Sequence, residues 1–172
     1  SKMVIIWAHN PASTSPHFMP LLREAQRNGA KIVVIDPRRS KTARSADLHI
    51  PIMPGTDAAL ALGMMNVIFS EGLHDEDWLE ANTVGWRELR DRAAEYPVDR
   101  VASITGVGAE TIQSLAREYA TTKPAMLKIA PALNRHEHGG QTVRATCCLP
   151  AVAGQIGIRG GGLYEGTGSH LQ

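Results

Sequence analysis

The sequence predicts an α/β fold in which helices cover both faces of a mainly parallel sheet. Short apolar segments rich in β-branched residues alternate along the chain with segments of helical periodicity. The apolar segments at residues 3–7 and 31–35 have almost no polar interruption, which is typical of strands buried on both faces. Parallel strands are usually joined by right-handed helical crossovers, so the alternation favours three αβα layers.

The composition indicates a globular protein without an unusual charge. The chain has 172 residues, of which 43% are hydrophobic and 20% are charged, and this suits one domain with a buried core. The 18 Lys and Arg residues nearly balance the 17 Asp and Glu residues, so the chain lacks the large positive charge that is typical of nucleic-acid-binding proteins. No apolar stretch approaches the ~18 residues that a membrane-spanning helix needs. We therefore expect neither a nucleic-acid partner nor a membrane span in this segment.

The two ends of the sequence suggest a segment of a longer protein. Ser1 and Lys2 lead straight into an apolar segment, and the end, GGGLYEGTGSHLQ, contains no closing element. We therefore interpret residues 1–172 as a single α/β domain of a larger protein, with an irregular tail at residues 158–172. A targeting signal would lie outside such a segment, so the sequence leaves the cellular location open.

The first two strands are joined by one helix. Residues 3–7 (MVIIW) and 31–35 (KIVVI) form the strands, and the helical spacing of apolar residues covers about residues 20–28. Gly29 follows that helix, as is common where a helix ends in a left-handed residue.

The third strand is short and leads into a buried helix. Residues 48–52 (LHIPI) contain Pro51, which favours an edge position in the sheet or an early end of the strand. Thr56 can cap the next helix, and Asp57 complements the positive end of its dipole. Residues 58–69 are apolar almost all round, so this helix should be deeply buried.

The second half of the chain adds a helical insertion and a fourth strand. Residues 74–105 are more polar and contain short helical segments, which predicts a small helical insertion over the core. Residues 108–120 have a strong amphipathic spacing, and residues 125–130 are the fourth strand. A last helix covers residues 139–157, with a bend expected at its internal proline.

Polar or conformationally special residues follow every predicted strand at its carboxyl end. The segments are AHNPASTS (8–15), DPRRS (36–40), MPGTD (53–57) and PALNRHEHGG (131–140), whereas the opposite ends of the strands carry plain connections. In open parallel sheets, ligands bind beyond the carboxyl ends of the strands. The sequence therefore predicts one binding edge.

Asp36 is the most informative residue of these segments, and its position allows three interpretations. An acid at the end of a second strand often binds a ribose in dinucleotide-binding folds. A carboxylate can equally accept hydrogen bonds from the N1–H and the 2-amino group of guanine, while Arg38 and Arg39 pair with phosphate or stack on a base. The third interpretation is an ordinary strand-end turn with two solvated arginines.

The first and third loops are also open to two interpretations. NPAST replaces a glycine-rich phosphate loop, but Asn10 can donate and accept hydrogen bonds, and Ser13, Thr14 and Ser15 can offer hydroxyls to a phosphate at a helix start. The alternative is a turn that merely caps the helix. In PGTD, Gly55 and Asp57 can meet the ring or sugar of a ligand, or the segment serves only to cap the next helix.

The residues that commonly bind metal ions form no convincing site. His136 and His138 are close in sequence, but two ligands make a poor metal site. The only two cysteines, Cys147 and Cys148, are adjacent, which disfavours a disulfide between them and matches no metal-binding spacing. We expect them to be small apolar residues on a buried helix.

Several stretches together resemble one known family. IIWAHNPASTSPH, GAKIVVIDPRRSKTARSADLHIPIMPGTDAALALGMMNVI, EGLHDEDWLEANTVGWRELR, ITGVGAETIQSLAREYA and GGQTVRATCCLPAVAGQIGIRGGG are similar to segments of the molybdopterin oxidoreductases of the dimethyl sulfoxide reductase and formate dehydrogenase superfamily. The resemblance runs from about residue 3 to residue 163. It implies a Rossmann-like domain that holds the guanosine diphosphate end of a molybdopterin guanine dinucleotide.

The resemblance also implies roles for individual positions after each strand. Asp36 is the implied guanine-binding carboxylate, and no residue of the segment is implied to be catalytic or to bind the metal. The implied cofactor-binding residues are Asn10, Ser13, Ile35, Asp36, Arg38, Pro54, Gly55, Asp57, Pro131 and Arg135.

What surrounds the segment is implied in the same way. The parent enzyme would carry Mo or W in a bis(molybdopterin guanine dinucleotide) cofactor, with an iron–sulfur cluster in its N-terminal part. It would act on a small-molecule substrate, pass electrons to a partner subunit, and enclose the cofactor with other domains of the same chain. The family's metal ligand and cluster-binding cysteines have no counterpart here, so the segment alone is expected to be inactive.

Two departures and two rival functions accompany this interpretation. The family often has glycine at the position of Ala8 and a Gly-x-Gly in the fourth loop, where this chain has Ala130, Pro131 and Ala132. One rival is a non-catalytic scaffold domain of an iron–sulfur respiratory subunit, although the intact polar loops argue against it. The other rival is a stand-alone nucleotide-binding module with a regulatory role.

Overall fold

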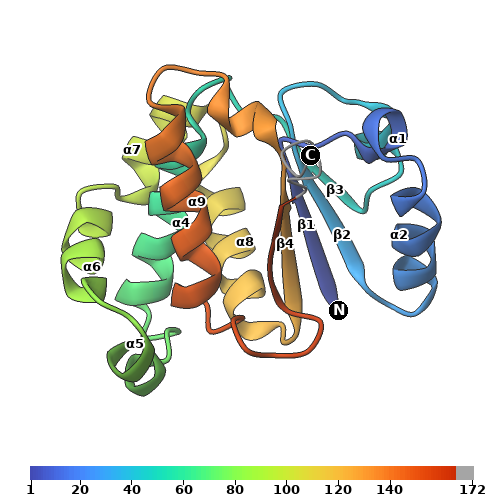
Figure 1. Ribbon diagram of the computed structural model, residues 1–172. Coiled ribbons are helices and arrows are strands. Elements are labelled where there is room, and N and C mark those ends of the chain that lie inside the picture. Colours follow the sequence, from blue (N-terminus) through green and yellow to red (C-terminus); the bar gives the residue numbers. More distant parts are fainter. Residues whose placement is uncertain (166–172) are drawn as a thin grey trace, which may run out of the picture.

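A computed structural model describes residues 1–165 of the chain (Figure 1). It contains one sheet with the strand order β3-β2-β1-β4-β5, in which all neighbouring strands are parallel. The predicted α/β class with a parallel sheet is therefore confirmed, and β3 lies at an edge, in agreement with its proline. The strands are β1 (Met3–Trp7), β2 (Lys31–Ile35), β3 (Leu48–Ile50), β4 (Ala125–Ile129) and β5 (Gly162–Glu165).

Helices lie on both faces of the sheet, as the alternating pattern predicts. In Figure 1, α1 and α2 lie on one side of β1 and β2, while α4, α8 and α9 lie on the other side. The first group is α1 (Pro11–Thr14), α2 (Phe18–Arg27) and α3 (Lys41–Arg44). The other helices are α4 (Asp57–Ser70), α5 (Glu76–Asn82), α6 (Trp86–Ala94), α7 (Val98–Thr105), α8 (Ala109–Thr121), α9 (Gly139–Val152) and the 3₁₀ helix η1 (Pro131–Asn134).

The two faces of the sheet bury two separate hydrophobic clusters. Ile5 and Trp7 of β1 belong to the larger cluster around α4, α8 and α9, and Val4 and Ile6 belong to the smaller cluster below α2. Successive side chains of a strand point to opposite faces, so a strand between two helical layers must be apolar at every position. This explains why MVIIW has no polar interruption.

Helix α4 is buried along nearly its whole length, and the predicted insertion packs around it. Helices α6, α7, α8 and α9 all contact α4, which explains its lack of a polar face. Gly63 allows α7 to approach closely, because a Cβ atom at Gly63 would lie 2.7 Å from Cγ2 of Val101. Within residues 1–165, no helix is both long enough and apolar enough to cross a membrane.

The C-terminal part differs from the prediction. Strand β5 lies within residues 158–172, which the sequence analysis assigns to an irregular tail; residues 166–172 lie outside the described residues. The segment GLYE has no β-branched residue and follows two glycines, so it lacks a local strand signal, and its pairing with β4 makes it a strand. Helix α9 ends at Val152 rather than at residue 157, just before Gly154, whose φ is 63°.

Around the third strand, one prediction is confirmed and one is wrong. The strand ends at Ile50, before residue 52, and this is the early end that Pro51 favours because it cannot donate a ladder hydrogen bond. The Thr56 side chain does not cap α4; its hydroxyl instead donates to the carbonyl oxygen of Met53, at 2.7 Å, within the turn that leads into the helix.

Candidate functional site

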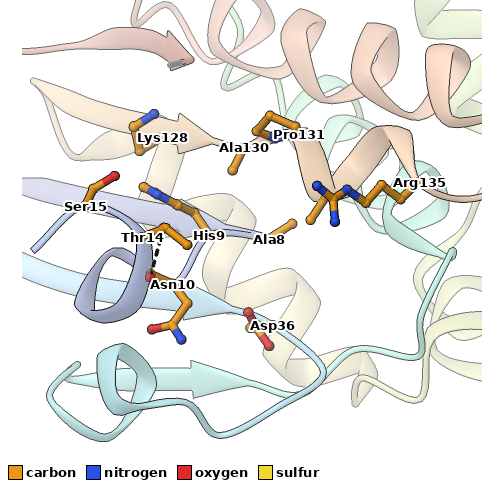
Figure 2. Close-up of a pocket in the computed structure, with 11 residues that line it drawn as sticks. Ala8, His9, Asn10, Thr14, Ser15, Asp36, Lys128, Ala130, Pro131 and Arg135 are labelled. Atoms are coloured by element: carbon orange, nitrogen blue, oxygen red, sulfur yellow. Dashed lines mark hydrogen bonds between the residues drawn. The ribbon is translucent and has the colours of Figure 1, made fainter. Parts of the chain in front are cut away.

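A cavity of about 450 Å³ lies at the carboxyl edge of the sheet (Figure 2). The segments that follow β1, β2 and β4 converge on it, as the parallel sheet requires. The segment that follows β3 does not line it. The lining residues are Ala8, His9, Asn10, Thr14, Ser15, Asp36, Lys128, Ala130, Pro131, Ala132 and Arg135.

The structure brings four of the ten sequence-predicted site residues together in this cavity. These are Asn10, Asp36, Pro131 and Arg135. The other six do not line it. They are Ser13, Ile35, Arg38, Pro54, Gly55 and Asp57.

Ala8 turns the chain from β1 into the cavity wall. Its φ is 53°, in the left-handed region that costs a residue with a Cβ about 1–2 kcal/mol. The N–H of Ala8 donates to the carbonyl oxygen of Ile35, at 2.9 Å, and this bond holds the turn against β2. Ile35 itself is fully buried, so its side chain belongs to the core. The left-handed backbone gives a physical reason for a glycine at this position.

A hydrogen-bond network fixes the side chain of Asn10. The hydroxyl of Thr42, in α3, donates to Oδ1 of Asn10 at 2.7 Å and accepts from the N–H of Ala12 at 3.1 Å. Because the hydroxyl has one hydrogen, accepting from Ala12 leaves that hydrogen for Asn10, and the amide oxygen must face Thr42. The NH₂ group of Asn10 donates to Oγ of Ser13, at 3.1 Å, and keeps its second hydrogen for a ligand. Ser13 thus orients Asn10 from outside the cavity.

Asp36 is held by a local turn. Its Oδ1 accepts from the N–H of Arg38 at 2.8 Å, and His49 bonds to its carbonyl oxygen at 2.8 Å. A carboxylate has about four acceptor sites, so this turn leaves Oδ2, and part of Oδ1, free for a ligand. The Arg38 side chain is exposed and lies outside the cavity lining.

Asp57 is not open to a ligand. It is only 5% exposed, and its Oδ1 accepts from Nε1 of Trp7 at 2.7 Å. Asp57 therefore fixes the start of α4 to the end of β1 and satisfies a buried indole donor. The ligand contact suggested by the sequence stays a prediction for this residue.

The remaining part of the third loop lies beside the fourth loop. Pro54 and Gly55 are exposed, and a Cβ atom at Gly55 would lie 3.6 Å from the ring of His136. Gly55 has a φ of 80°, so this turn suits glycine on conformational grounds as well. The two loops are neighbours at the same edge, although only the fourth contributes to the cavity.

Pro131 and Arg135 enter the cavity from the fourth loop. Pro131 begins η1, with one residue between it and the end of β4 at Ile129, and Arg135 follows the end of that helix. The start of α9 packs closely behind the loop, because a Cβ atom at Gly139 would lie 2.6 Å from the carbonyl oxygen of Asn134.

His9 and Lys128 are two cavity residues that the sequence analysis missed. His9 is 9% exposed, and its Nδ1 is buried without a hydrogen-bond partner among the described residues. Burial, and then the charge of Lys128, lowers the pKa of His9 below its ordinary value. Burial also lowers the pKa of Lys128, against an opposing effect of Glu165. A lone lysine inside the apolar strand AMLKIA is the signal that could have revealed this end of the cavity.

Residues 1–165 contain no cluster of three or more His, Cys, Asp or Glu side chains that could hold a metal ion. Cys147 and Cys148 form no disulfide, and burial raises the pKa of both thiols. Both are partly buried on α9 and pack against the larger hydrophobic cluster, which fits the interpretation as small apolar residues.

Comparison with known proteins decides the family. The family model described as "Molybdopterin oxidoreductase" matches residues 1–170 of the chain. The chain belongs to the molybdopterin oxidoreductase family. The resemblance found in the strand-end motifs is therefore confirmed, and membership of this family implies a cofactor in which molybdenum or tungsten is bound to a pterin.

Individual molybdopterin oxidoreductases agree with this assignment in sequence and in structure. The chain is 46% identical over 172 residues to the probable oxidoreductase YoaE of Bacillus subtilis (strain 168). This match covers 100% of the chain and 25% of that protein. It is 37% identical over 157 residues to formate dehydrogenase H of Escherichia coli (strain K12), covering 91% of this chain and 22% of that protein. A solved structure of acetylene hydratase from Pelobacter acetylenicus superposes with a TM-score of 0.82 at 38% identity, over 92% of this chain and 22% of that chain.

These relatives differ in what their names say they do. They include a formate dehydrogenase, an acetylene hydratase and an assimilatory nitrate reductase, so membership of the family does not fix a substrate. The chain spans about a quarter, or less, of the length of these molybdopterin oxidoreductases.

Proposed function

We propose that the carboxyl edge of this sheet binds the guanosine diphosphate end of a molybdopterin guanine dinucleotide. The observation that carries the proposal is the convergence of Asn10, Asp36 and Arg135 on one cavity. These side chains come from three separate strand ends and supply an amide, a carboxylate and a guanidinium. The cavity volume of about 450 Å³ falls in the range of small-molecule sites, about 300–1,000 Å³.

The donors and acceptors at this edge suit a guanine nucleotide. Oδ2 of Asp36 can accept from the 2-amino group of guanine while Oδ1 accepts from N1–H and keeps its bond to Arg38. Adenine presents no such pair of adjacent donors, so Asp36 selects guanine over adenine. Arg135 and the free hydrogen of Asn10 can contact the diphosphate.

The residues outside the cavity have two different roles in this proposal. Arg38, Pro54 and Gly55 are exposed at the same edge, where a nucleotide that extends beyond the cavity can contact them. Ser13, Ile35 and Asp57 support the loops from behind, through the bonds to Asn10, Ala8 and Trp7.

The chain then positions a cofactor rather than performing chemistry with its own side chains. The bound cofactor would supply the exchange of an oxygen atom, or of a hydride or proton together with electrons, with a small substrate. We infer that the metal ligand, the second pterin, an iron–sulfur cluster and the electron-accepting subunit belong to other parts of the enzyme. The chain alone is therefore proposed to be inactive.

Titration of the purified chain with GDP and ADP tests the proposal. We expect tighter binding of GDP, and we expect the variant Asp36→Asn to bind GDP and ADP equally, because asparagine keeps the turn acceptor for Arg38 but replaces one guanine acceptor by a donor. Loss of the guanine-specific pair corresponds to about ten- to hundredfold weaker GDP binding.

The variant Asp91→Ala is the control, because Asp91 is an exposed residue of α6 far along the chain from the cavity loops. Equal binding of GDP and ADP by the unmodified chain would contradict the guanine assignment. Absence of binding by any nucleotide would favour the scaffold alternative, and equally strong binding of several nucleotides would favour the regulatory module.

A further inference from the structure

One end of the cavity presents two basic side chains, neither of which forms a salt bridge within residues 1–165. Lys128 is paired in register with Ile6, so its side chain emerges on the sheet face that carries α1 and α2. His9 reaches the same end from the loop between β1 and α1, and the charge of Lys128 acts on it. Figure 2 shows His9 lying between the first-loop residues and Lys128.

The hydrogen-bonding capacity of both side chains is incompletely used. Nζ of Lys128 donates to the neighbouring carbonyl oxygen of Ile129 at 3.1 Å and has two further hydrogens. Nδ1 of His9 has no partner among residues 1–165, although it is buried. Buried polar atoms in folded proteins are nearly always hydrogen-bonded, so this nitrogen calls for a partner from outside residues 1–165, such as an ordered water or a ligand atom.

A hydroxyl completes a set of donors at this end. The hydroxyl of Thr14 already donates to the carbonyl oxygen of Asn10, at 3.1 Å, so it has no hydrogen left for a ligand. Ser15 also lines the cavity, and its hydroxyl has no bond within the described residues. Ser15, His9 and Lys128 all line the cavity and can donate hydrogen bonds into it, which suits an anionic group with several acceptor oxygens.

The charges around this end favour an anion. Lys128 and Arg135 are the cations that line the cavity, Asp36 is its acid at the end of β2, and Glu165 of β5 acts on Lys128. No carboxylate of residues 1–165 forms a salt bridge with Lys128. Two neighbouring basic groups repel each other, and an anion bound between them removes that cost.

We propose that His9, Lys128 and Ser15 bind a phosphate group of the ligand, and that phosphate binding takes up one proton at His9. This inference rests on the proposed nucleotide function. It adds His9 and Lys128 to Ser15, whose hydroxyl the sequence already suggested for a phosphate. In the free chain at pH 7, His9 is mainly neutral, because burial and Lys128 hold its pKa below the ordinary value of 6.5. A bound phosphate places negative charge beside His9. This charge outweighs the positive charge of Lys128 and so favours the imidazolium form of His9.

Titration calorimetry with inorganic pyrophosphate separates this site from base recognition. We expect Lys128→Met to weaken pyrophosphate binding about ten- to hundredfold, the usual effect of losing a charged hydrogen bond. Lys2→Met makes the same change of charge before β1, at the opposite edge of the sheet, and is expected to leave the affinity unchanged. Guanosine, which lacks phosphate, should bind equally well to the parent chain and to Lys128→Met.

The proton is measured by repeating the titration in buffers of different ionisation enthalpy. Pyrophosphate also exchanges protons of its own on binding, so the difference between two variants is compared. Near pH 7 the parent chain should take up close to one proton more per pyrophosphate than His9→Asn does. As a second measurement, the imidazole resonances of His9 should titrate at higher pH in free Lys128→Met than in the parent chain.

Equal effects of Lys128→Met and Lys2→Met on pyrophosphate binding would overturn the inference, as would equal proton uptake by the parent chain and His9→Asn. These outcomes are independent of the comparison of GDP with ADP, which tests recognition of the guanine base. A chain that prefers GDP through Asp36 but binds pyrophosphate without Lys128 retains the proposed function and loses this inference. A chain that binds pyrophosphate through Lys128 but does not distinguish GDP from ADP gives the opposite result.

Discussion

Thr42 is the residue whose removal tests the architecture of the site most selectively. It is 1% exposed, and its hydroxyl joins the loop after β1 to the helix after β2 through Asn10 and Ala12. The substitution Thr42→Val keeps the shape of the side chain and removes both hydrogen bonds. At about 1 kcal/mol for each bond, plus part of the cost of an unpaired buried amide, we expect a loss of about 2–3 kcal/mol in the free energy of unfolding.

This loss is measurable by thermal and urea denaturation followed by circular dichroism. For a chain of this size, 2–3 kcal/mol corresponds to a decrease in Tm of about 5–10 °C. Asn10 would also lose the bond that orients its amide, so GDP binding should weaken about two- to fivefold, the cost of ordering one side chain. The variant Thr42→Ser keeps the hydroxyl and is expected to retain the affinity.

A double-mutant cycle gives the sharpest form of this test. If the Thr42 hydroxyl acts through Asn10, then Thr42→Val and Asn10→Ala should be coupled by about 1 kcal/mol in the free energy of unfolding. Additive effects, or a Thr42→Val variant as stable as Thr42→Ser, would refute the network.

Three further predictions concern residues around the cavity. Ala8→Gly should raise the free energy of unfolding by about 1 kcal/mol in urea denaturation, because it relieves the left-handed φ of 53°; an unchanged or lower stability would contradict the strain. Asp57→Ala should lower it by about 2–3 kcal/mol, because Nε1 of Trp7 loses its buried acceptor, whereas Asp57→Asn, which keeps an acceptor, should lose less; equal losses would be inconsistent with the bond. The free energy of unfolding should decrease as the pH falls below about 6.5, because His9 is protonated more readily in the unfolded chain. Urea denaturation between pH 5 and 7 measures this decrease, which should be smaller in His9→Asn.

The sequence predicted most of the fold because its strands are covered on both faces. MVIIW and KIVVI are apolar at nearly every position, and only a strand between two helical layers needs such a pattern. Pro51 indicated the edge position of β3 for an equally local reason, the missing amide hydrogen. Strand β5 could not be predicted in this way, because GLYE becomes a strand through the free edge of β4, which is distant in sequence.

The convergence of the strand-end loops on one edge could be predicted, but the direction of individual side chains could not. Parallel strands necessarily bring Asn10, Asp36 and Arg135 to one edge. Asp57 has the same kind of position, yet it points to the indole of Trp7, and nothing in PGTD distinguishes a buried acid from a ligand-binding one. Lys128 was missed for the opposite reason, because it lies within a strand rather than after one.

The central claim is that a guanine nucleotide binds at the carboxyl edge of the sheet. The most direct test adds GDP to the isotope-labelled chain and maps which backbone amide resonances shift. Our account predicts that the largest shifts occur at Asn10, Asp36 and Arg135, after three different strands, and that Gly29 and Lys123, before β2 and β4, do not shift. Shifts concentrated at Gly29 and Lys123, or on α5 and α6, would show that the nucleotide binds elsewhere and would contradict the account.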